Sequence, residues 1–233
     1  MKITRVEAIV LRQPAVNDAI ADGSQDDLII RIETDAGIVG IGEVDSAPEV
    51  VKAAVEAPNS HANSLGLRHL LVGRDPLDIE GLWNAMYRGS VYFGRRGVAM
   101  HAISGIDLAL WDIKGKALDK PVCELIGTPL RQRIKAYAST LMPETEDAVR
   151  GRVDELHRAG FRAIKFGWGP LGRDVQQDIR LCTAAVEAGS GDVEILIDAG
   201  LGYGADAARA LPFARALQDL GVVWLEEPFG PED

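Results

Sequence analysis

Three ionisable residues follow short apolar runs at similar intervals along the chain. Lys165, Asp198 and Glu226 are 33 and 28 residues apart, which is about the length of one strand–helix unit. Parallel strands joined by right-handed helical crossovers end on one rim of a sheet, so we expect these three side chains to lie close together. Two carboxylates on one rim provide the oxygen ligands that a hard divalent cation such as Mg²⁺ binds.

Each of these residues also has a simpler structural interpretation. Lys165 could be a surface lysine, and Asp198 and Glu226 could be helix caps. Because all three follow short apolar runs at similar intervals, a shared site is favoured, as on the catalytic rim of a β/α barrel. A Schiff-base aldolase that uses Lys165 is a further alternative, which we favour less because the neighbouring acids fit a metal better.

The runs before the two acids predict buried parallel strands. V-E-I-L-I precedes Asp198 and V-V-W-L precedes Glu226, and both runs are rich in Val, Ile and Leu. Residues 205–220, between them, carry apolar side chains at helical spacing. A third run, residues 161–168, carries Lys165. The repeat of strand, acid and helix predicts an α/β architecture for this part of the chain.

The chain divides into two predicted domains. Residues 1–125 predict a small α+β domain, and residues 126–233 predict about the first four strand–helix units of a β/α barrel. Residues 13–26 contain Pro, Asn, Asp and Gly without periodicity, which predicts a loop. Strands are expected at residues 1–12, 28–34 and 38–44, and the clearest helix at residues 102–118. The strand–helix repeat is expected to start with residues 133–140.

The composition excludes several classes of function. The chain of 233 residues has a net charge of -10, which opposes binding to nucleic acid or to an anionic membrane. It has no run of 18 apolar residues and no apolar signal core at its start. Cys123 and Cys182 are far apart and are predicted to be free thiols in a reducing compartment. We therefore expect a cytoplasmic protein.

Three motifs resemble the mandelate racemase and muconate lactonizing enzyme family of the enolase superfamily. They are the helix A-I-S-G-I-D-L-A-L-W-D-I-K-G-K-A-L-D-K-P at residues 102–121, I-D-A-G at 197–200 and W-L-E-E-P at 224–228. The resemblance covers the whole chain in the right order. It implies an α+β capping domain over a modified (β/α)7β barrel, with Mg²⁺ held by three acids on successive strands. It also implies abstraction of the proton α to a carboxylate.

The resemblance assigns a role to each candidate residue. Asp198 would be the first metal ligand and Glu226 the second, and Lys165 would be the first lysine of a K-x-K motif near the substrate carboxylate. Ser139 would line the substrate pocket, although a structural role is an equal alternative. The loop at residues 13–26 would close on the substrate.

The sequence departs from the family pattern at three places. Gly167 replaces the second lysine of K-x-K, and Gly200 replaces the usual Asn of D-x-N. The family's third metal ligand and its His/Asp pair would follow on later strands, and the chain ends at Asp233. We therefore expect a chain truncated after the fourth barrel strand.

These residues favour dehydration of a sugar acid. The enediolate formed by loss of an α-proton carries concentrated negative charge, which a divalent cation and a nearby ammonium stabilise. Racemisation needs a catalytic group on each face, and Gly167 leaves one face without the expected base. We predict a Mg²⁺-dependent acid-sugar dehydratase that acts as a homo-oligomer. The alternatives are a racemase, epimerase or cycloisomerase of the superfamily, or a non-catalytic metal- or anion-binding fragment.

Overall fold

The chain forms two compact units, Met1–Leu130 and Arg131–Asp233. A computed structural model describes residues 1–18, 23–45 and 47–232. None of the helices in these ranges has the length and hydropathy that a bilayer-spanning segment needs. The assignment of residues 1–125 as a capping domain stays a prediction.

An antiparallel sheet forms one layer of the first unit, with its strands in the order β1-β2-β3. Its alternating sequence explains its two faces: Leu28, Ile30 and Ile32 of β2 are fully buried, and the residues between them point to the other face. A short 3-10 helix precedes β2. The bounds are β1 (Ile3–Arg12), η1 (Gly23–Gln25), β2 (Asp26–Thr34) and β3 (Val39–Val44).

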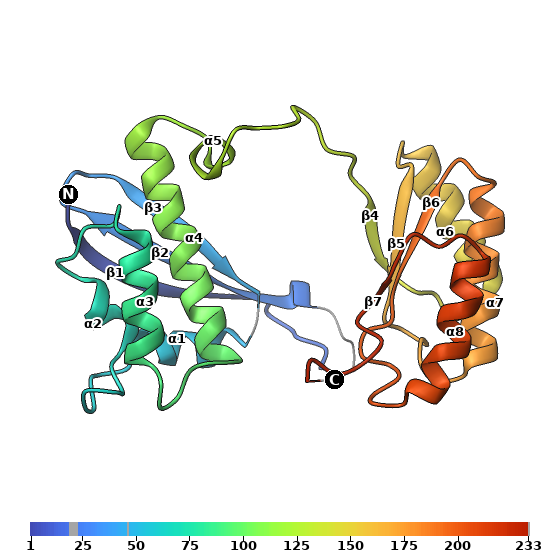
Figure 1. Ribbon diagram of the computed structural model, residues 1–233, viewed down its shortest axis with the longest axis horizontal. Helices are drawn as coiled ribbons and strands as arrows, with labels where there is room; N and C mark the ends of the chain where they lie inside the picture. The colour runs from blue at the N-terminus through green and yellow to red at the C-terminus, as the bar shows by residue number, and fades with distance from the viewer. Residues whose placement is uncertain (19–22, 46, 233) are drawn as a thin grey trace. The chain divides into compact units, whose positions relative to one another are not determined.

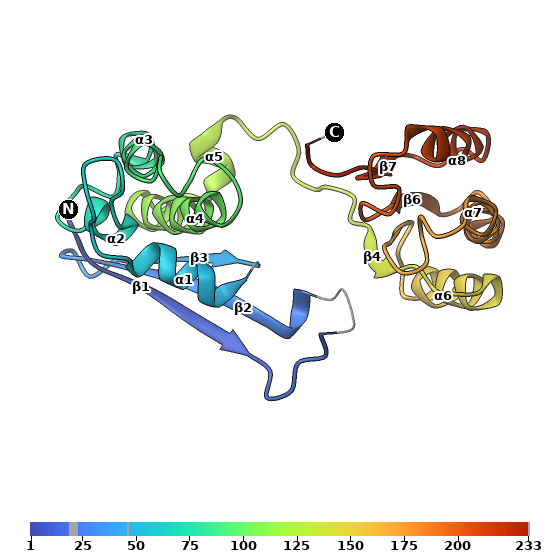
Figure 2. The same cartoon turned by 90° about the horizontal axis from the view of Figure 1, so that it is seen from below.

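Helices cover the buried face of this sheet (Figure 1 and Figure 2). The longest, α4, buries Ile103, Ile106, Leu110 and Ile113 as its spacing predicts, and it begins four residues before the predicted start at residue 102. The bounds are α1 (Pro48–Glu56), α2 (Leu67–Leu71), α3 (Ile79–Gly89), α4 (Val98–Leu118) and α5 (Val122–Ile126).

Helix α4 packs directly on the backbone of strand β3. A Cβ atom on Gly42 would lie 1.9 Å from the carbonyl oxygen of Gly105, so the two backbones are in contact. Two side chains of α4 also bond to this outer strand: Asp112 accepts from the Ile41 N–H (2.8 Å) and Lys116 donates to the Val39 carbonyl (2.8 Å). They occupy polar groups that an open strand edge would leave free for another strand.

The second unit contains a parallel sheet with helices on one face (Figure 1 and Figure 2). Four strands in the order β4-β5-β6-β7 alternate with three helices along the chain, which confirms the predicted beginning of a β/α barrel. The bounds are β4 (Ala138–Leu141), α6 (Glu146–Arg158), β5 (Ala163–Gly167), α7 (Val175–Gly189), β6 (Glu194–Asp198), α8 (Ala207–Asp219) and β7 (Leu225–Glu226).

Two of these strands are shorter than the sequence predicts. Strand β4 begins at Ala138 instead of residue 133, because its pairing with β5 starts at Ile164. Strand β7 contains only Leu225 and Glu226, and Glu227 follows with a positive φ of 43°, which ends the extended conformation.

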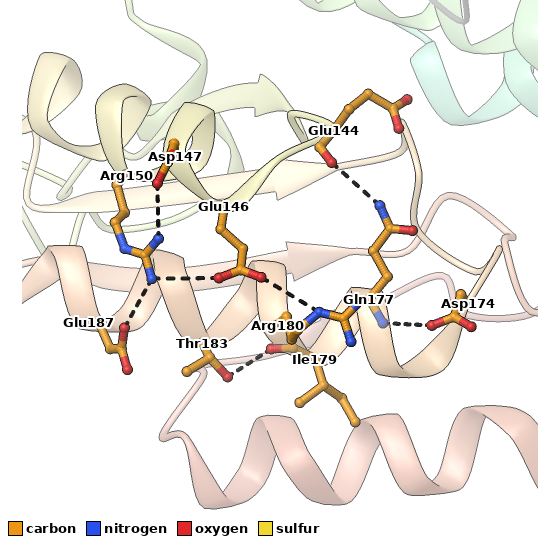
Figure 3. Close-up of polar contacts among 10 residues, drawn as sticks. All are labelled: Glu144, Glu146, Asp147, Arg150, Asp174, Gln177, Ile179, Arg180, Thr183 and Glu187. Carbon is orange, nitrogen blue, oxygen red and sulfur yellow. Dashed lines mark hydrogen bonds and ion pairs between the residues drawn. The ribbon is translucent and has the colours of Figure 1, made fainter.

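Ion pairs join the exposed surfaces of α6 and α7 (Figure 3). Arg150 lies 3.5 Å from Asp147 and 3.4 Å from Glu187, and Glu146 lies 3.7 Å from Arg150 and 3.6 Å from Arg180. Exposed pairs of this kind each contribute at most about 1 kcal/mol. The network therefore adds little to the stability of this helix pair.

Candidate active site

The structure brings together the three ionisable residues that the spacing singled out. Lys165 lies on β5, and Asp198 and Glu226 are the last residues of β6 and β7, where they are register partners. The Lys165 Nζ atom lies 3.2 Å from Asp198 Oδ2 and 2.9 Å from Glu226 Oε2. Two carboxylates from adjacent strands thus converge on one cationic group.

The carboxylates of Asp198 and Glu226 stabilise the positive charge of Lys165. Its side chain is 12% exposed, and those of Asp198 and Glu226 are 9% and 36% exposed. Burial alone lowers the pKa of Lys165, but hydrogen bonds and attraction from Glu226 and Asp198 outweigh that effect and raise the pKa. In this arrangement Lys165 is an ammonium donor and not a proton acceptor.

Local hydrogen bonds orient both carboxylates. Asp198 Oδ1 accepts from the Gly200 N–H at 3.0 Å, and the Trp224 indole N–H donates to Glu226 Oε2 at 3.2 Å. The Trp168 N–H donates to the backbone carbonyl of Asp198 at 3.0 Å. Each acid is therefore positioned by its own loop or strand in addition to its contact with Lys165.

Two aromatic residues near the site, Tyr137 and Trp224, were not among the site residues predicted from the sequence. The rings of Tyr137 and Trp224 meet edge to face at 5.8 Å, and Lys165 Nζ lies 5.9 Å from the Tyr137 ring centroid. The signal that could have found Trp224 is the two-residue period of a strand, because it lies two positions before Glu226.

Ser139 lies beside Lys165 as its register partner in the pairing of β4 with β5. Its side chain is exposed. This position is compatible with a place in the substrate pocket, and that role stays a prediction.

The two glycines that replace family residues have steric reasons to be small. A Cβ atom on Gly167 would lie 3.0 Å from the Cβ of Asp198, so a side chain there would press on a candidate ligand. Gly200 has a φ of +54°, and a Cβ atom on it would lie 2.6 Å from the Trp168 ring. Trp168 therefore occupies the volume in which an Asn side chain at position 200 would begin.

The donor set fits a magnesium ion in its chemistry. Mg²⁺ is commonly held by one or two carboxylates and keeps several waters, and Asp198 and Glu226 already converge on a positive charge. Within residues 1–18, 23–45 and 47–232, no three His, Cys, Asp or Glu side chains form a metal cluster. These two carboxylates would therefore begin a coordination that needs further oxygen ligands.

The loop expected to close on the substrate is described only in part. Residues 19–22 of the segment 13–26 lie outside the described residues. On either side of them, the Gln13 N–H donates to the Gln25 carbonyl at 2.9 Å and the Asn17 N–H donates to Gln25 Oε1 at 2.6 Å. The role of this loop in closure stays a prediction.

Family models match both units of the chain. Residues 1–127 match the mandelate racemase / muconate lactonizing enzyme N-terminal domain, and residues 148–233 match the enolase C-terminal domain-like family. The chain belongs to the mandelate racemase and muconate lactonizing enzyme family. The α+β unit and the partial barrel of this family member agree with the fold that the resemblance implied.

Relatives of this family member carry several activities in their names. The D-galactarolactone cycloisomerase of Agrobacterium fabrum is 33% identical over 242 residues, covering 100% of this chain and 60% of the relative. The arabinonate dehydratase of Saccharolobus solfataricus is 34% identical over 214 residues, covering 90% of this chain and 54% of the relative. The chain thus spans little more than half the length of these curated relatives.

A solved relative contains the expected metal. The crystal structure of a racemase from Streptomyces coelicolor A3(2) with bound magnesium has a TM-score of 0.83 and 29% sequence identity to this family member. The similarity covers 99% of this chain and 64% of that protein. Magnesium binding is thus present in a protein of closely similar fold.

Proposed function

We propose that this chain provides the metal- and carboxylate-binding part of a Mg²⁺-dependent acid-sugar dehydratase. The observation that carries the proposal is the convergence of Asp198 and Glu226 on one positive charge at the ends of adjacent strands. The dehydratase name of a relative that is 34% identical supports the reaction class. The magnesium of the racemase structure supports the cofactor.

Each residue of the site has a role in this proposal. A bound Mg²⁺ supplies Lewis-acid stabilisation of negative charge on a substrate carboxylate. Asp198 and Glu226 hold the ion, and Lys165 remains protonated and donates hydrogen bonds to the substrate carboxylate. Ser139, beside Lys165 in register, lines the pocket. Gly167 leaves room next to Asp198 and provides no second base.

A cycloisomerase is the second candidate. The observation that favours it is the 33% identity to D-galactarolactone cycloisomerase over the whole chain. The two reactions differ in the mass of their products, because dehydration removes one water and cycloisomerisation leaves the mass unchanged. Mass spectrometry after incubation of the full-length protein with sugar acids and their lactones distinguishes them.

Magnesium binding is tested by its effect on stability. A ligand that binds only the folded state stabilises it, by about 2.7 kcal/mol at 100 times its Kd. We expect Mg²⁺ to raise the Tm of the wild-type chain and Asp198→Asn to remove this rise. Glu194→Gln is the matched control, because Glu194 lies on the same strand and pairs with Lys135. An equal rise in Asp198→Asn and the control would exclude Asp198 as a ligand.

The remaining features of the proposal concern the whole protein. We assign residues 1–125 as a capping domain and residues 126–233 as the first part of the barrel, which the separate family matches to 1–127 and 148–233 support. We further propose a cytoplasmic homo-oligomer. Size-exclusion chromatography with light scattering tests the oligomeric state, and a monodisperse monomer would contradict it.

A further inference from the structure

A buried carboxylate lies behind the candidate active site. Asp178 on α7 is fully buried, at 0% exposure. Its Oδ2 atom accepts two hydrogen bonds, from the Gly172 N–H at 2.9 Å and from the Tyr203 hydroxyl at 2.6 Å. Gly172 belongs to the loop after β5 and Tyr203 to the loop after β6. One oxygen atom therefore joins the two loops that follow the strands of Lys165 and Asp198.

The Tyr203 loop is also bonded to the segment that begins at Glu226. The N–H groups of Ala199, Leu201 and Tyr203 donate to the carbonyls of Glu226, Glu227 and Pro228 at 2.9, 2.8 and 3.1 Å. These bonds extend the contact between the two segments beyond the two carboxylates, but they leave the β6–β7 register, because N–H groups two residues apart bond to consecutive carbonyls. A shift of Tyr203 would therefore disturb the segments that follow Asp198 and Glu226.

The loops after β5 and β6 pack closely against each other. A Cβ atom on Gly172 would lie 2.2 Å from the Gly202 carbonyl oxygen, so the loop backbones are in direct contact. The Tyr203 ring stacks on Phe213 of α8, with centroids 5.4 Å apart. The position of Tyr203 is thus fixed by packing on one side and by Asp178 on the other.

Burial of the Asp178 carboxylate destabilises the folded state, which indicates that this side chain has a specific role. A carboxylate removed from water is destabilising unless its oxygens are bonded. Burial raises the pKa of Asp178, although the Tyr203 and Gly172 hydrogen bonds oppose this effect. Its Oδ1 atom has no hydrogen-bond partner in the described part of the chain. An apolar residue would fill the same space without this cost, but it would leave the Gly172 N–H and the Tyr203 hydroxyl without an acceptor.

We propose that Asp178 is a positioning residue for the metal site, which fixes the loops after β5 and β6 and, through the bonds of residues 199–203 to residues 226–228, supports the backbone next to Asp198 and Glu226. The inference rests on the proposed function for its metal, and its geometric part stands on the hydrogen bonds alone. Groups that hydrogen-bond directly to metal ligands typically contribute about 10- to 100-fold to metal affinity. Asp178 acts one step further away, through the Tyr203 loop, so its effect should not exceed the lower end of this range.

The test compares substitutions at Asp178 in the full chain. We expect Asp178→Ala to weaken Mg²⁺ binding by up to about 10-fold in calorimetric titration, and to speed hydrogen exchange at the Leu201 and Tyr203 amides. Asp178→Asn should keep wild-type values for both, because its side-chain oxygen can still accept both hydrogen bonds. If Asp178→Ala does not fold, Tyr203→Phe, which removes only one hydroxyl, provides the test and should change both values in the same direction.

Asp174→Ala is the matched control for lost stability. Asp174 precedes the same helix, and its side chain accepts from the Gln177 N–H at 2.7 Å (Figure 3). Its carbonyl accepts from the Asp178 N–H at 2.9 Å, and the substitution leaves this backbone bond in place. This control should lower the Tm without changing the Kd for Mg²⁺. It should also not speed hydrogen exchange selectively at the Leu201 and Tyr203 amides.

Three results would overturn the inference. They are wild-type Kd and amide protection in Asp178→Ala, the same losses in Asp174→Ala, and losses in Asp178→Asn equal to those in Asp178→Ala. If the wild-type chain does not bind Mg²⁺, the proposed function fails, and the exchange rates still decide the positioning role.

Discussion

The indole of Trp168 lies so close to Gly200 that a Cβ atom on Gly200 would come within 2.6 Å of its ring. Both residues have positive φ values, 57° for Trp168 and 54° for Gly200. They follow neighbouring parallel strands, and Asp198 bonds to both backbone N–H groups. The tryptophan and the glycine are therefore a complementary pair beside a candidate metal ligand.

Gly200→Ala should destabilise the chain by about 1–3 kcal/mol, because the added methyl meets the indole and the positive φ disfavours a side chain. Trp168→Ala in the same chain should recover the steric part of this loss. Urea unfolding of the two single variants and the double variant measures the coupling. Strictly additive losses would show that the indole does not limit the size of residue 200.

Lys165→Met should destabilise the metal-free chain by about 1–3 kcal/mol, because it leaves two converging carboxylates without a counter-ion and one of them is partly solvated. Mg²⁺ should stabilise this variant at least as much as wild type, since the ion replaces the missing charge. Urea unfolding with and without Mg²⁺ measures both effects.

Lys135→Met is the matched control for this prediction. Lys135 also pairs with an acid on β6, Glu194, but both side chains are exposed. Its loss should change stability by no more than about 0.5 kcal/mol. Equal effects of the two lysine substitutions would mean that Lys165 is an ordinary surface partner.

Tyr203 should make stability fall at alkaline pH. Burial, and after it the hydrogen bond to Asp178, raises the pKa of its hydroxyl above the usual value of about 10. As pH rises past about 10, the unfolded chain loses this proton before the folded chain does, so the stabilisation present at lower pH is lost.

Tyr203→Phe should reduce the slope of unfolding free energy against pH by up to about 1.4 kcal/mol per pH unit in this range. Urea unfolding between about pH 9 and 11 measures the slope. Tyr92→Phe, at an exposed tyrosine, is the control. Equal slopes in wild type and Tyr203→Phe would contradict the buried position of the hydroxyl.

The two free cysteines should differ in reactivity. Cys123 is exposed, whereas Cys182 is buried and its thiol pKa is raised, first by burial and then by Asp178. A thiol reagent should label Cys123 in the folded chain and label Cys182 only when the chain opens. Mass spectrometry of labelled peptides with and without urea measures this, and rapid labelling of Cys182 in native buffer would argue against its packing.

The sequence predicted the meeting of Lys165, Asp198 and Glu226 because the topology of parallel strands determines which ends share a rim. It did not predict that Lys165 would bond to both acids, because side-chain contacts depend on rotamers and on the spacing of three strands. The start of β4 was also wrong, since a strand needs a paired neighbour and its partner strand begins only at Ala163.

The Asp178 network was missed, although the sequence contains a signal for it. Asp178 shares one helical face with Leu181, Cys182 and Ala185, which are buried, so an acid interrupts an otherwise apolar stripe. Such an acid needs a hydrogen-bond donor in the core. Its partners come from two loops on either side of the helix, at Gly172 and Tyr203, and spacing alone does not identify them.

The contact between Gly42 and Gly105 limits how the first unit can change during evolution or engineering. The Gly105 backbone occupies the volume in which a side chain on Gly42 would begin, and a Cβ atom on Gly105 would lie 2.3 Å from a methyl group of Val44. Enlargement of Gly42 meets backbone, which no substitution can make smaller, whereas enlargement of Gly105 meets a side chain that a smaller residue could replace. A mutational library should therefore recover only glycine at position 42, and should accept alanine at position 105 only together with a residue smaller than valine at position 44.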